Sequence, residues 1–267
     1  MRVGLGSYAF RWSIGHRDRV PERPMTAMEL LDVAAELGVE VLQYADNLPL
    51  HRLPAGEIDD LGRTARERGI ALEVGTAAFD PDMVRTYLDI AQRLEAGILR
   101  VALDKEDAAR PVPELAARMR DLVPELRAAG VRLAVENHFE FPSGQLDALV
   151  REVGEAEVGV CLDVANSICA GEWPEETVRL LVPHAINLHL KDYLIQPDPY
   201  GVGFRIHGTP LGTGRSDLSG VLAALPGPMS VIYEHWLPWP GDFDAAAQQE
   251  REWTAKGVQV IRRLCHA

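Results

Sequence analysis

Apolar residues along the chain alternate between two kinds of spacing. In one kind of segment they recur every three or four residues, as in Leu30, Val33, Ala34 and Leu37, which places them on one face of a helix. In the other kind they form short runs rich in valine, isoleucine and leucine, as expected of strands. Eight strand-like runs alternate with helical segments, at residues 2–7, 39–44, 70–75, 98–103, 131–136, 157–162, 185–190 and 229–234. The pattern predicts eight consecutive strand and helix units.

The points where helices end agree with this division. Gly38, Gly69, Gly97 and Gly130 each stand directly before a valine or isoleucine that opens a strand-like run. Glycine suits the left-handed residue that commonly ends a helix. Helical crossovers return each strand parallel to the one before, so we predict the α/β class, a (β/α)8 TIM barrel of one domain over 1–267. An open doubly wound sheet is the alternative, but no glycine-rich phosphate-binding motif follows the first strand.

Alternation within the last four strands predicts which side chains enter the barrel. Successive side chains of a barrel strand point in turn to the interior and to the surrounding helices. Bulky apolar pairs share one parity, which we expect to face the helices: Leu133 and Val135, Val160 and Leu162, Ile186 and Leu188, Val231 and Tyr233. The other parity then points inward, and in each strand it reaches a potential metal ligand at the carboxyl end: Glu136, Asp163, His189 and Glu234. Barrel enzymes place their chemistry at this face.

Three carboxylates that converge on one barrel mouth repel one another unless a positive charge lies between them. A divalent cation removes the repulsion, and three oxygen ligands with one nitrogen suit Mn²⁺, Mg²⁺ or Co²⁺, while Zn²⁺ is also compatible. The alternative is ion pairing with Lys or Arg inside the barrel. No Lys or Arg stands at the matching ends of strands 5, 6 and 8, which favours one bound metal ion.

Composition narrows the classes of partner. The chain has 267 residues and a formal charge of −13, which disfavours nucleic acid as a partner because such binding relies on Lys and Arg. No stretch approaches the roughly 20 apolar residues of a membrane span, and the N-terminus lacks the features of a secretory signal. Three cysteines without metal-type spacing favour a reducing compartment. We therefore expect a cytoplasmic protein that binds neither nucleic acid nor a membrane.

Several segments also carry a family resemblance. LAVENH (133–138), VCLDVANS (160–167), HLKD (189–192), PLGTGRSDL (210–218) and VIYEHW (231–236) resemble the sugar phosphate isomerase/epimerase proteins of the xylose isomerase-like barrel superfamily. The resemblance implies that Glu136, Asp163, His189 and Glu234 bind one metal ion. It also implies that Glu136 and Glu234 act as a pair of acid–base groups on a small carbohydrate substrate.

The implied chemistry is isomerisation or epimerisation of a keto-sugar or sugar acid through a metal-stabilised enediolate. More narrowly, SYAFRWSIG (7–15), LQYADNLPL (42–50), ENHFEFP (136–142) and EREWTAKGVQVIRRL (250–264) look like a branch that includes 3-oxo-isoapionate decarboxylases. Loss of CO2 from a 3-oxo sugar acid is therefore the alternative reaction. A non-catalytic sugar-binding barrel is a further alternative.

Two related functions fit the residues less well. Zinc-dependent endonucleases acting at abasic DNA sites share this architecture, but they need several more histidines at strand ends than this chain supplies. The two-metal xylose isomerase proper needs further Asp and His ligands, which are also missing. Both functions are therefore disfavoured.

Other residues are predicted to contact the substrate. His138 and Lys191 each stand two positions beyond a predicted ligand and share its inward parity. Glu73 and Arg100 are predicted to point inward from adjacent strands, either as a buried ion pair that fills the barrel or as direct substrate contacts. Arg205 lies in the long connection 192–215, which we expect to be a lid or binding loop, and it could hold an anionic group or simply face solvent.

Aromatic residues cluster near the predicted mouth. Tyr8, Trp12 and Tyr44 are expected to form apolar walls of a sugar pocket. Trp236 and Trp239 follow Glu234 and are predicted to close the pocket; the alternative is a contact between copies in a homo-oligomer. His235 has outward parity and is expected to touch the last helix.

Overall fold

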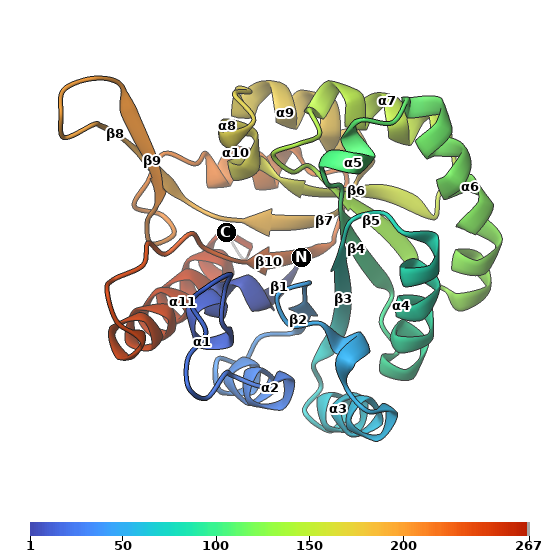
Figure 1. Ribbon diagram of the computed structural model, residues 1–267, viewed down its shortest axis with the longest axis horizontal. Helices are drawn as coiled ribbons and strands as arrows, with labels where there is room; N and C mark the ends of the chain where they lie inside the picture. Colours follow the sequence, from blue (N-terminus) through green and yellow to red (C-terminus); the bar gives the residue numbers. More distant parts are fainter. Residues whose placement is uncertain (266–267) are drawn as a thin grey trace.

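Eight parallel strands close into a barrel in the computed structural model, which describes residues 1–265 (Figure 1). Around the barrel the strands follow the order β1-β10-β7-β6-β5-β4-β3-β2. Their bounds are β1 Arg2–Gly6, β2 Val41–Tyr44, β3 Ala71–Ala77, β4 Ile98–Ala102, β5 Arg132–Glu136, β6 Val158–Asp163, β7 Ala185–Leu190 and β10 Ser230–Tyr233. Each predicted strand overlaps one of these, so the predicted (β/α)8 barrel is confirmed.

Helices surround the barrel on its outside (Figure 1). They are α1 Arg11–Ile14, α2 Ala27–Glu36, α3 Ala55–Glu67, α4 Pro81–Leu94, α5 Lys105–Ala108, α6 Val112–Ala129, α7 Ser143–Val153, α8 Val164–Cys169, α9 Pro174–Leu181, α10 Leu218–Ala224 and α11 Phe243–Cys265, with short 3₁₀ turns η1 Ser7–Phe10, η2 Leu50–Arg52 and η3 Val182–His184. None of these helices, all within residues 1–265, combines the length and the apolar character that crossing a membrane requires.

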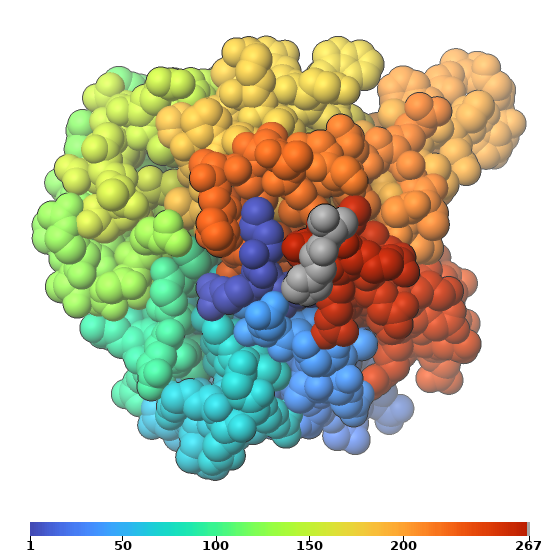
Figure 2. Space-filling model, turned by 180° about the vertical axis from the view of Figure 1, so that it is seen from behind, coloured from blue at the N-terminus to red at the C-terminus, as the bar shows by residue number. Residues whose placement is uncertain are grey.

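The first residues of the chain and the end of α11 lie on the same side of the barrel. Figure 2 shows the first residues beside the end of α11, and β1 packs against that helix. Arg262 on α11 donates hydrogen bonds to the carbonyl oxygens of Leu37, at 2.6 Å, and Gly38, at 2.5 Å. These bonds cover carbonyl groups left free where α2 ends.

The barrel interior differs from the alternation rule at one strand pair. Ile186 was expected to face the helices, but it packs with Ile98, Ala134 and Cys161 inside the barrel. The register between β6 and β7 shifts at Val160/Cys161, which is a β-bulge. Opposite the bulge, a Cβ on Gly159 would lie 2.7 Å from Ile186 Cγ2, so glycine leaves the space that Ile186 fills.

The connection 192–215 contains an antiparallel hairpin, β8 Tyr193–Pro197 and β9 Phe204–Gly208, which projects from the barrel (Figure 1). The buried carboxylate of Asp192 holds its base, because it accepts hydrogen bonds from the backbone amides of Gly212 and Gly214 at 2.9 and 2.8 Å. The connection expected to be a lid or binding loop therefore contains a two-stranded hairpin.

Candidate active site and metal centre

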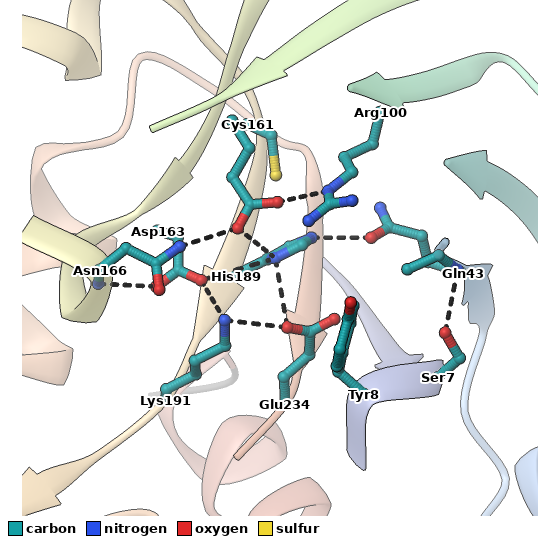
Figure 3. A network of polar contacts seen from close by, with 12 residues as sticks. Ser7, Tyr8, Gln43, Arg100, Cys161, Asp163, Asn166, His189, Lys191 and Glu234 are labelled. Atoms are coloured by element: carbon teal, nitrogen blue, oxygen red, sulfur yellow. Dashed lines mark hydrogen bonds and ion pairs between the residues drawn. The ribbon is translucent and has the colours of Figure 1, made fainter. Parts of the chain in front are cut away.

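Four polar side chains meet at the carboxyl ends of β5, β6, β7 and β10, and all are at most 1% exposed: Glu136, Asp163, His189 and Glu234. His189 Nδ1 faces one oxygen of each carboxylate, at 3.8 Å for Glu136, 3.7 Å for Asp163 and 3.5 Å for Glu234. Figure 3 shows His189, Asp163 and Glu234 turned toward one another. The structure thus brings together the four side chains that the sequence predicts as metal ligands.

Backbone contacts fix the strand ends that carry this cluster. The side-chain amide of Asn137, directly after Glu136, donates a hydrogen bond to the backbone carbonyl of Asp163 and accepts one from its backbone N–H, both at 2.7 Å. On the other side, a Cβ on Gly6 would lie 2.5 Å from Glu234 Oε1, so only glycine at the end of β1 leaves Glu234 its position.

The orientation of His189 is set by Gln43 on β2. Gln43 Oε1 lies 2.8 Å from His189 Nε2 (Figure 3), while the Gln43 amide nitrogen donates to Glu73 at 2.9 Å. Because a carbonyl oxygen only accepts, Nε2 is the protonated nitrogen, and the lone pair of Nδ1 is left facing the carboxylates. Metal-binding histidines are typically held in this way by their second nitrogen.

No hydrogen-bond partner for this buried Nδ1 exists among residues 1–265. Burial acts to lower the pKa of His189, but Cys161 and the carboxylates around the ring outweigh burial and raise that pKa well above its ordinary value. The site therefore attracts positive charge at Nδ1, in the form of a proton or a metal ion. The orphaned nitrogen and three carboxylate oxygens fit a divalent cation with oxygen and nitrogen ligands.

Cys161 is a fifth candidate ligand that the sequence analysis did not single out. A ligand set of Glu136, Cys161 and His189 is close enough for one ion. However, burial raises the pKa of the Cys161 thiol to about 11, and the thiol donates to Asn187 Oδ1 at 3.3 Å. A protonated, hydrogen-bonded thiol is a weaker ligand than the carboxylates, so the oxygen-rich set is the better site.

Two buried cations also pair with the cluster, so the ion-pairing alternative is part of the site. Lys191 contacts Asp163 and lies 3.0 Å from Glu234 Oε2, and Arg100 pairs with Glu136 and, at 2.7 Å, with Asp46. Burial acts to lower the pKa of Lys191, but Asp163 and the other carboxylates outweigh it and raise that pKa above its usual value. Four carboxylates thus share two cations, which leaves room for a further positive charge.

Glu136 and Glu234 differ in what their oxygens contact. Glu136 binds Arg100 through Oε2 and accepts from the Asn166 amide at 2.9 Å through Oε1. Burial acts to raise the pKa of Glu136, but positive charges, Arg100 first among them, hold it well below its usual range. Glu234 Oε1, in contrast, is buried and has no hydrogen-bond partner among the described residues.

Glu73 lies deeper in the barrel, away from the cluster. It accepts hydrogen bonds from Gln43 and Asn187, both at 2.9 Å, and from Ser230 at 2.5 Å. The alternative of a Glu73–Arg100 ion pair is wrong, because Arg100 pairs instead with Glu136 and Asp46. Sequence reasoning missed Gln43 and Asn187; their inward parity on two predicted strands was the available signal.

A cavity of about 740 Å³ is lined by Glu136 and Glu234 of the cluster, while Asp163 and His189 lie behind its surface. Its lining includes these predicted substrate contacts: Tyr8, Arg100, His138, Lys191 and Trp236. His138 stacks on Phe139 with ring centroids 4.2 Å apart, and burial lowers its pKa, so its imidazole is neutral at pH 7. Glu73 and Arg205 are not in the lining; Arg205 lies on β9 and pairs with Asp198 at 2.5 Å.

Of the aromatic residues predicted to line the pocket, some line the cavity and others do not. Trp12 lines the cavity, and Tyr8 does so while its hydroxyl donates to Asp46 at 2.7 Å. Tyr44 does not, since it is fully buried and its hydroxyl donates to the Ala27 carbonyl of α2 at 2.8 Å. His235 packs against Trp253 of α11, which confirms the expected contact with the last helix.

The fold and the buried carboxylate–imidazole cluster define a (β/α)8 barrel with a candidate metal centre at the carboxyl ends of its strands. A family model described as the xylose isomerase-like TIM barrel matches residues 31–264, and the chain belongs to this family.

Individual relatives agree with that assignment. The chain is 30% identical over 264 residues to a 3-oxo-isoapionate decarboxylase of Pectobacterium atrosepticum, covering 98% of this chain and 95% of the relative. A D-psicose 3-epimerase crystallised with D-fructose has the same fold, with a TM-score of 0.73, 14% identity and 98% coverage of each chain. A xylose isomerase-like barrel of Mycobacterium smegmatis in complex with magnesium gives a TM-score of 0.65 at 18% identity, covering 96% of each chain.

Proposed function

We propose that this protein is a metal-dependent decarboxylase of a 3-oxo sugar acid such as 3-oxo-isoapionate. A divalent ion held by Glu136, Asp163, His189 and Glu234 would supply Lewis acidity, because it polarises a carbonyl oxygen and stabilises negative charge that develops there. The 30% identity to a 3-oxo-isoapionate decarboxylase over nearly the whole chain supports this choice.

The carrying observation is the asymmetry between the two glutamates. Epimerisation on opposite faces of a carbon needs one group to remove a proton and a second to return one. Both oxygens of Glu136 already accept hydrogen bonds, from Arg100 and Asn166, whereas Glu234 Oε1 has no hydrogen-bond partner among residues 1–265. One free carboxylate oxygen suits a reaction that transfers one proton.

Decarboxylation is such a reaction. The bond between the carboxylate and its neighbouring carbon breaks, CO2 leaves, and the electron pair moves onto the 3-oxo oxygen as an enolate. A proton then adds to the carbon. In this proposal Glu234 Oε1 takes up a proton from water and delivers it to that carbon, while Lys191 holds Asp163 and Glu234 Oε2 in place and Arg100 holds Glu136.

The cavity lining supplies the substrate contacts in this proposal. Neutral His138 and the Tyr8 hydroxyl contact substrate oxygens, and Trp236 forms an apolar wall beside Lys191, whose Nζ lies 5.7 Å from the indole centroid. We do not assign substrate contacts to Glu73 or Arg205, which lie outside the lining.

Isomerisation or epimerisation of a keto-sugar is the second candidate. It is favoured by the fact that Glu136 and Glu234 both line the same cavity. In that reaction Glu136 would exchange its contact with Arg100 or Asn166 for one with the substrate.

The test uses the protein reconstituted with Mn²⁺ or Mg²⁺ and supplied with 3-oxo-isoapionate or with ketoses in D2O. We expect release of CO2 from the acid, with one deuterium on the carbon that lost it, and loss of turnover when EDTA removes the metal ion. Deuterium gain by a ketose at constant carbon number would instead support the second candidate. Metal binding without turnover of any of these compounds would indicate a non-catalytic sugar-binding barrel.

A further inference from the structure

The cations that line the cavity are not equivalent. Arg100 and Lys191 are buried and paired with carboxylates of the cluster. Arg17 and Lys105 are exposed, so water solvates their charges. Arg11 differs from all four, because it lines the cavity, is half-buried, and forms no ion pair with any described carboxylate.

Arg11 has little compensation for its burial. Its Nε is buried and has no hydrogen-bond partner in the described part of the chain, and its guanidinium lies over the Tyr8 ring, 5.4 Å from the centroid. Burial lowers the pKa of Arg11 and outweighs the nearby carboxylates of Glu234 and Glu250, which act to raise it without forming an ion pair with the guanidinium. Removing such a cation from water has an unfavourable desolvation free energy, and an anion bound in the cavity would offset it.

The backbone around Arg11 is fixed from two sides. The buried carboxylate of Glu250 on α11 accepts hydrogen bonds from the amides of Trp12, at 2.6 Å, and Ser13, at 3.0 Å. The Trp12 indole donates to the Leu237 carbonyl at 2.9 Å. Arg11 is therefore presented by a preorganised segment and loses little freedom when it binds a ligand.

Arg11 also stands on the side of the cavity that holds the free oxygen of Glu234. Strands β1 and β10 are neighbours, with Leu5 beside Tyr233, and Gly6 at the end of β1 lies directly against Glu234. The chain runs from Gly6 through η1 to Arg11, and Arg11 and Glu234 line the same cavity. A small molecule can therefore contact both.

We propose that Arg11 binds the carboxylate of an acidic sugar substrate, while the carbonyl and hydroxyl oxygens of that substrate face the Glu136–Asp163–His189–Glu234 cluster. This inference rests on the proposed function and names what selects the substrate. A guanidinium pairs with a carboxylate through two parallel hydrogen bonds, which a neutral ketose lacks. Arg11 thus makes the cavity selective for sugar acids.

The test is a binding measurement that needs no turnover. Threonate is a four-carbon sugar acid without a keto group, so it does not lose CO2 by this route, and threitol is its neutral counterpart. Calorimetric titration of the Mn²⁺-loaded protein should give tighter binding of threonate than of threitol. Arg11→Gln should weaken threonate binding about 10- to 100-fold and leave threitol binding unchanged.

Arg17→Gln is the matched control, because it removes an exposed arginine from the same cavity lining, and it should leave both affinities unchanged. Arg11→Gln should also keep or raise the melting temperature, by about 2 °C, since an unpaired half-buried charge is removed. An arginine with only a structural role would lower the melting temperature when replaced.

The inference is overturned if Arg11→Gln binds threonate as tightly as the wild type, as it would if the carboxylate sat on the metal ion alone. It is also overturned if Arg17→Gln causes an equal loss. Arg11-dependent binding of threonate without CO2 release from any 3-oxo acid would overturn only the proposed function. CO2 release with unchanged threonate affinity in Arg11→Gln would overturn only this inference.

Discussion

Two polar clusters lie in the same barrel. The floor cluster lies deep in the barrel and consists of Glu73 with its donors Gln43, Asn187 and Ser230, and the mouth cluster at the carboxyl ends of the strands consists of Glu136, Asp163, His189 and Glu234. At the floor, Glu73 is 2% exposed and accepts three hydrogen bonds, from Gln43, Asn187 and Ser230. At the mouth, Glu234 is 1% exposed, yet its Oε1 has no partner among the described residues, and neither does His189 Nδ1. Buried polar groups normally find partners, so the unsatisfied cluster is the one arranged for a ligand. Two glutamates that are almost equally buried therefore differ in role: Glu73 satisfies the hydrogen bonds of the barrel interior, and Glu234 keeps an oxygen available for a ligand.

The largest expected effect comes from the mouth. Glu234→Gln keeps the shape of the side chain but removes the carboxylate that carries the proton, so kcat for CO2 release should fall about 10²- to 10⁴-fold. The variant also removes the charge that pairs with Lys191, so the free energy of unfolding should fall by about 1–3 kcal/mol, and kcat is therefore measured on the folded variant. Steady-state kinetics and thermal unfolding of the same preparation check both. A variant that retains more than a tenth of the activity would remove Glu234 from the mechanism.

Gln43 contacts both clusters, His189 at the mouth and Glu73 at the floor, and its replacement should give the second-largest effect. Gln43→Leu removes the acceptor that orients His189, so metal affinity should fall about 10- to 100-fold. Ser230→Ala is the matched control, because Ser230 also donates to Glu73 but does not contact His189. Titration with Mn²⁺ should therefore separate the two variants. Equal metal affinities in both would mean that Gln43 serves only the floor.

The floor itself should affect stability rather than turnover. Glu73→Gln replaces one accepting carboxylate oxygen with an NH2 group, which cannot accept a hydrogen bond from Gln43, Asn187 or Ser230. The free energy of unfolding should therefore fall by about 1–3 kcal/mol. The kcat of the folded variant should stay within about threefold of the wild type. Denaturant titration and kinetics measure these quantities. A large loss of kcat at full stability would contradict the division between floor and mouth.

Glu250, a buried carboxylate outside both clusters, gives the smallest expected effect, and this effect depends on pH. Burial raises its pKa from 4.5 to about 7, despite the hydrogen bonds it accepts from Trp12 and Ser13. Because the folded state holds this proton more tightly than the unfolded chain does, the contribution to stability is full below pH 4.5 and is lost as pH rises through 7. The melting temperature of the wild type should therefore fall between pH 5 and 8 more steeply than that of Glu250→Gln. Parallel pH profiles would contradict this assignment.

Much of this fold could be predicted from the sequence because the decisive pattern is local. Alternation within one strand and helical spacing within one helix are readable over a few residues, and they predicted all eight strands and the four residues of the mouth cluster. Each of those four residues ends its own strand, so closing the barrel brings them together whatever the details of packing. The sequence alone therefore determined the barrel, its chemical face and the members of the cluster.

Only the tertiary structure decided how neighbouring strands are staggered. Arg100 pairs in register with Gly75, two residues beyond Glu73, so the two charges predicted to meet lie in different layers of the barrel. The bulge that turns Ile186 inward, and the contact of His189 with Gln43, 146 residues away in the chain, depend on the same stagger. The burial of Arg11 without an ion pair to any carboxylate of residues 1–265 also arises only once β1, β10 and α11 are packed together. Register and long-range packing are set by the closed barrel as a whole, and no single segment of sequence encodes them.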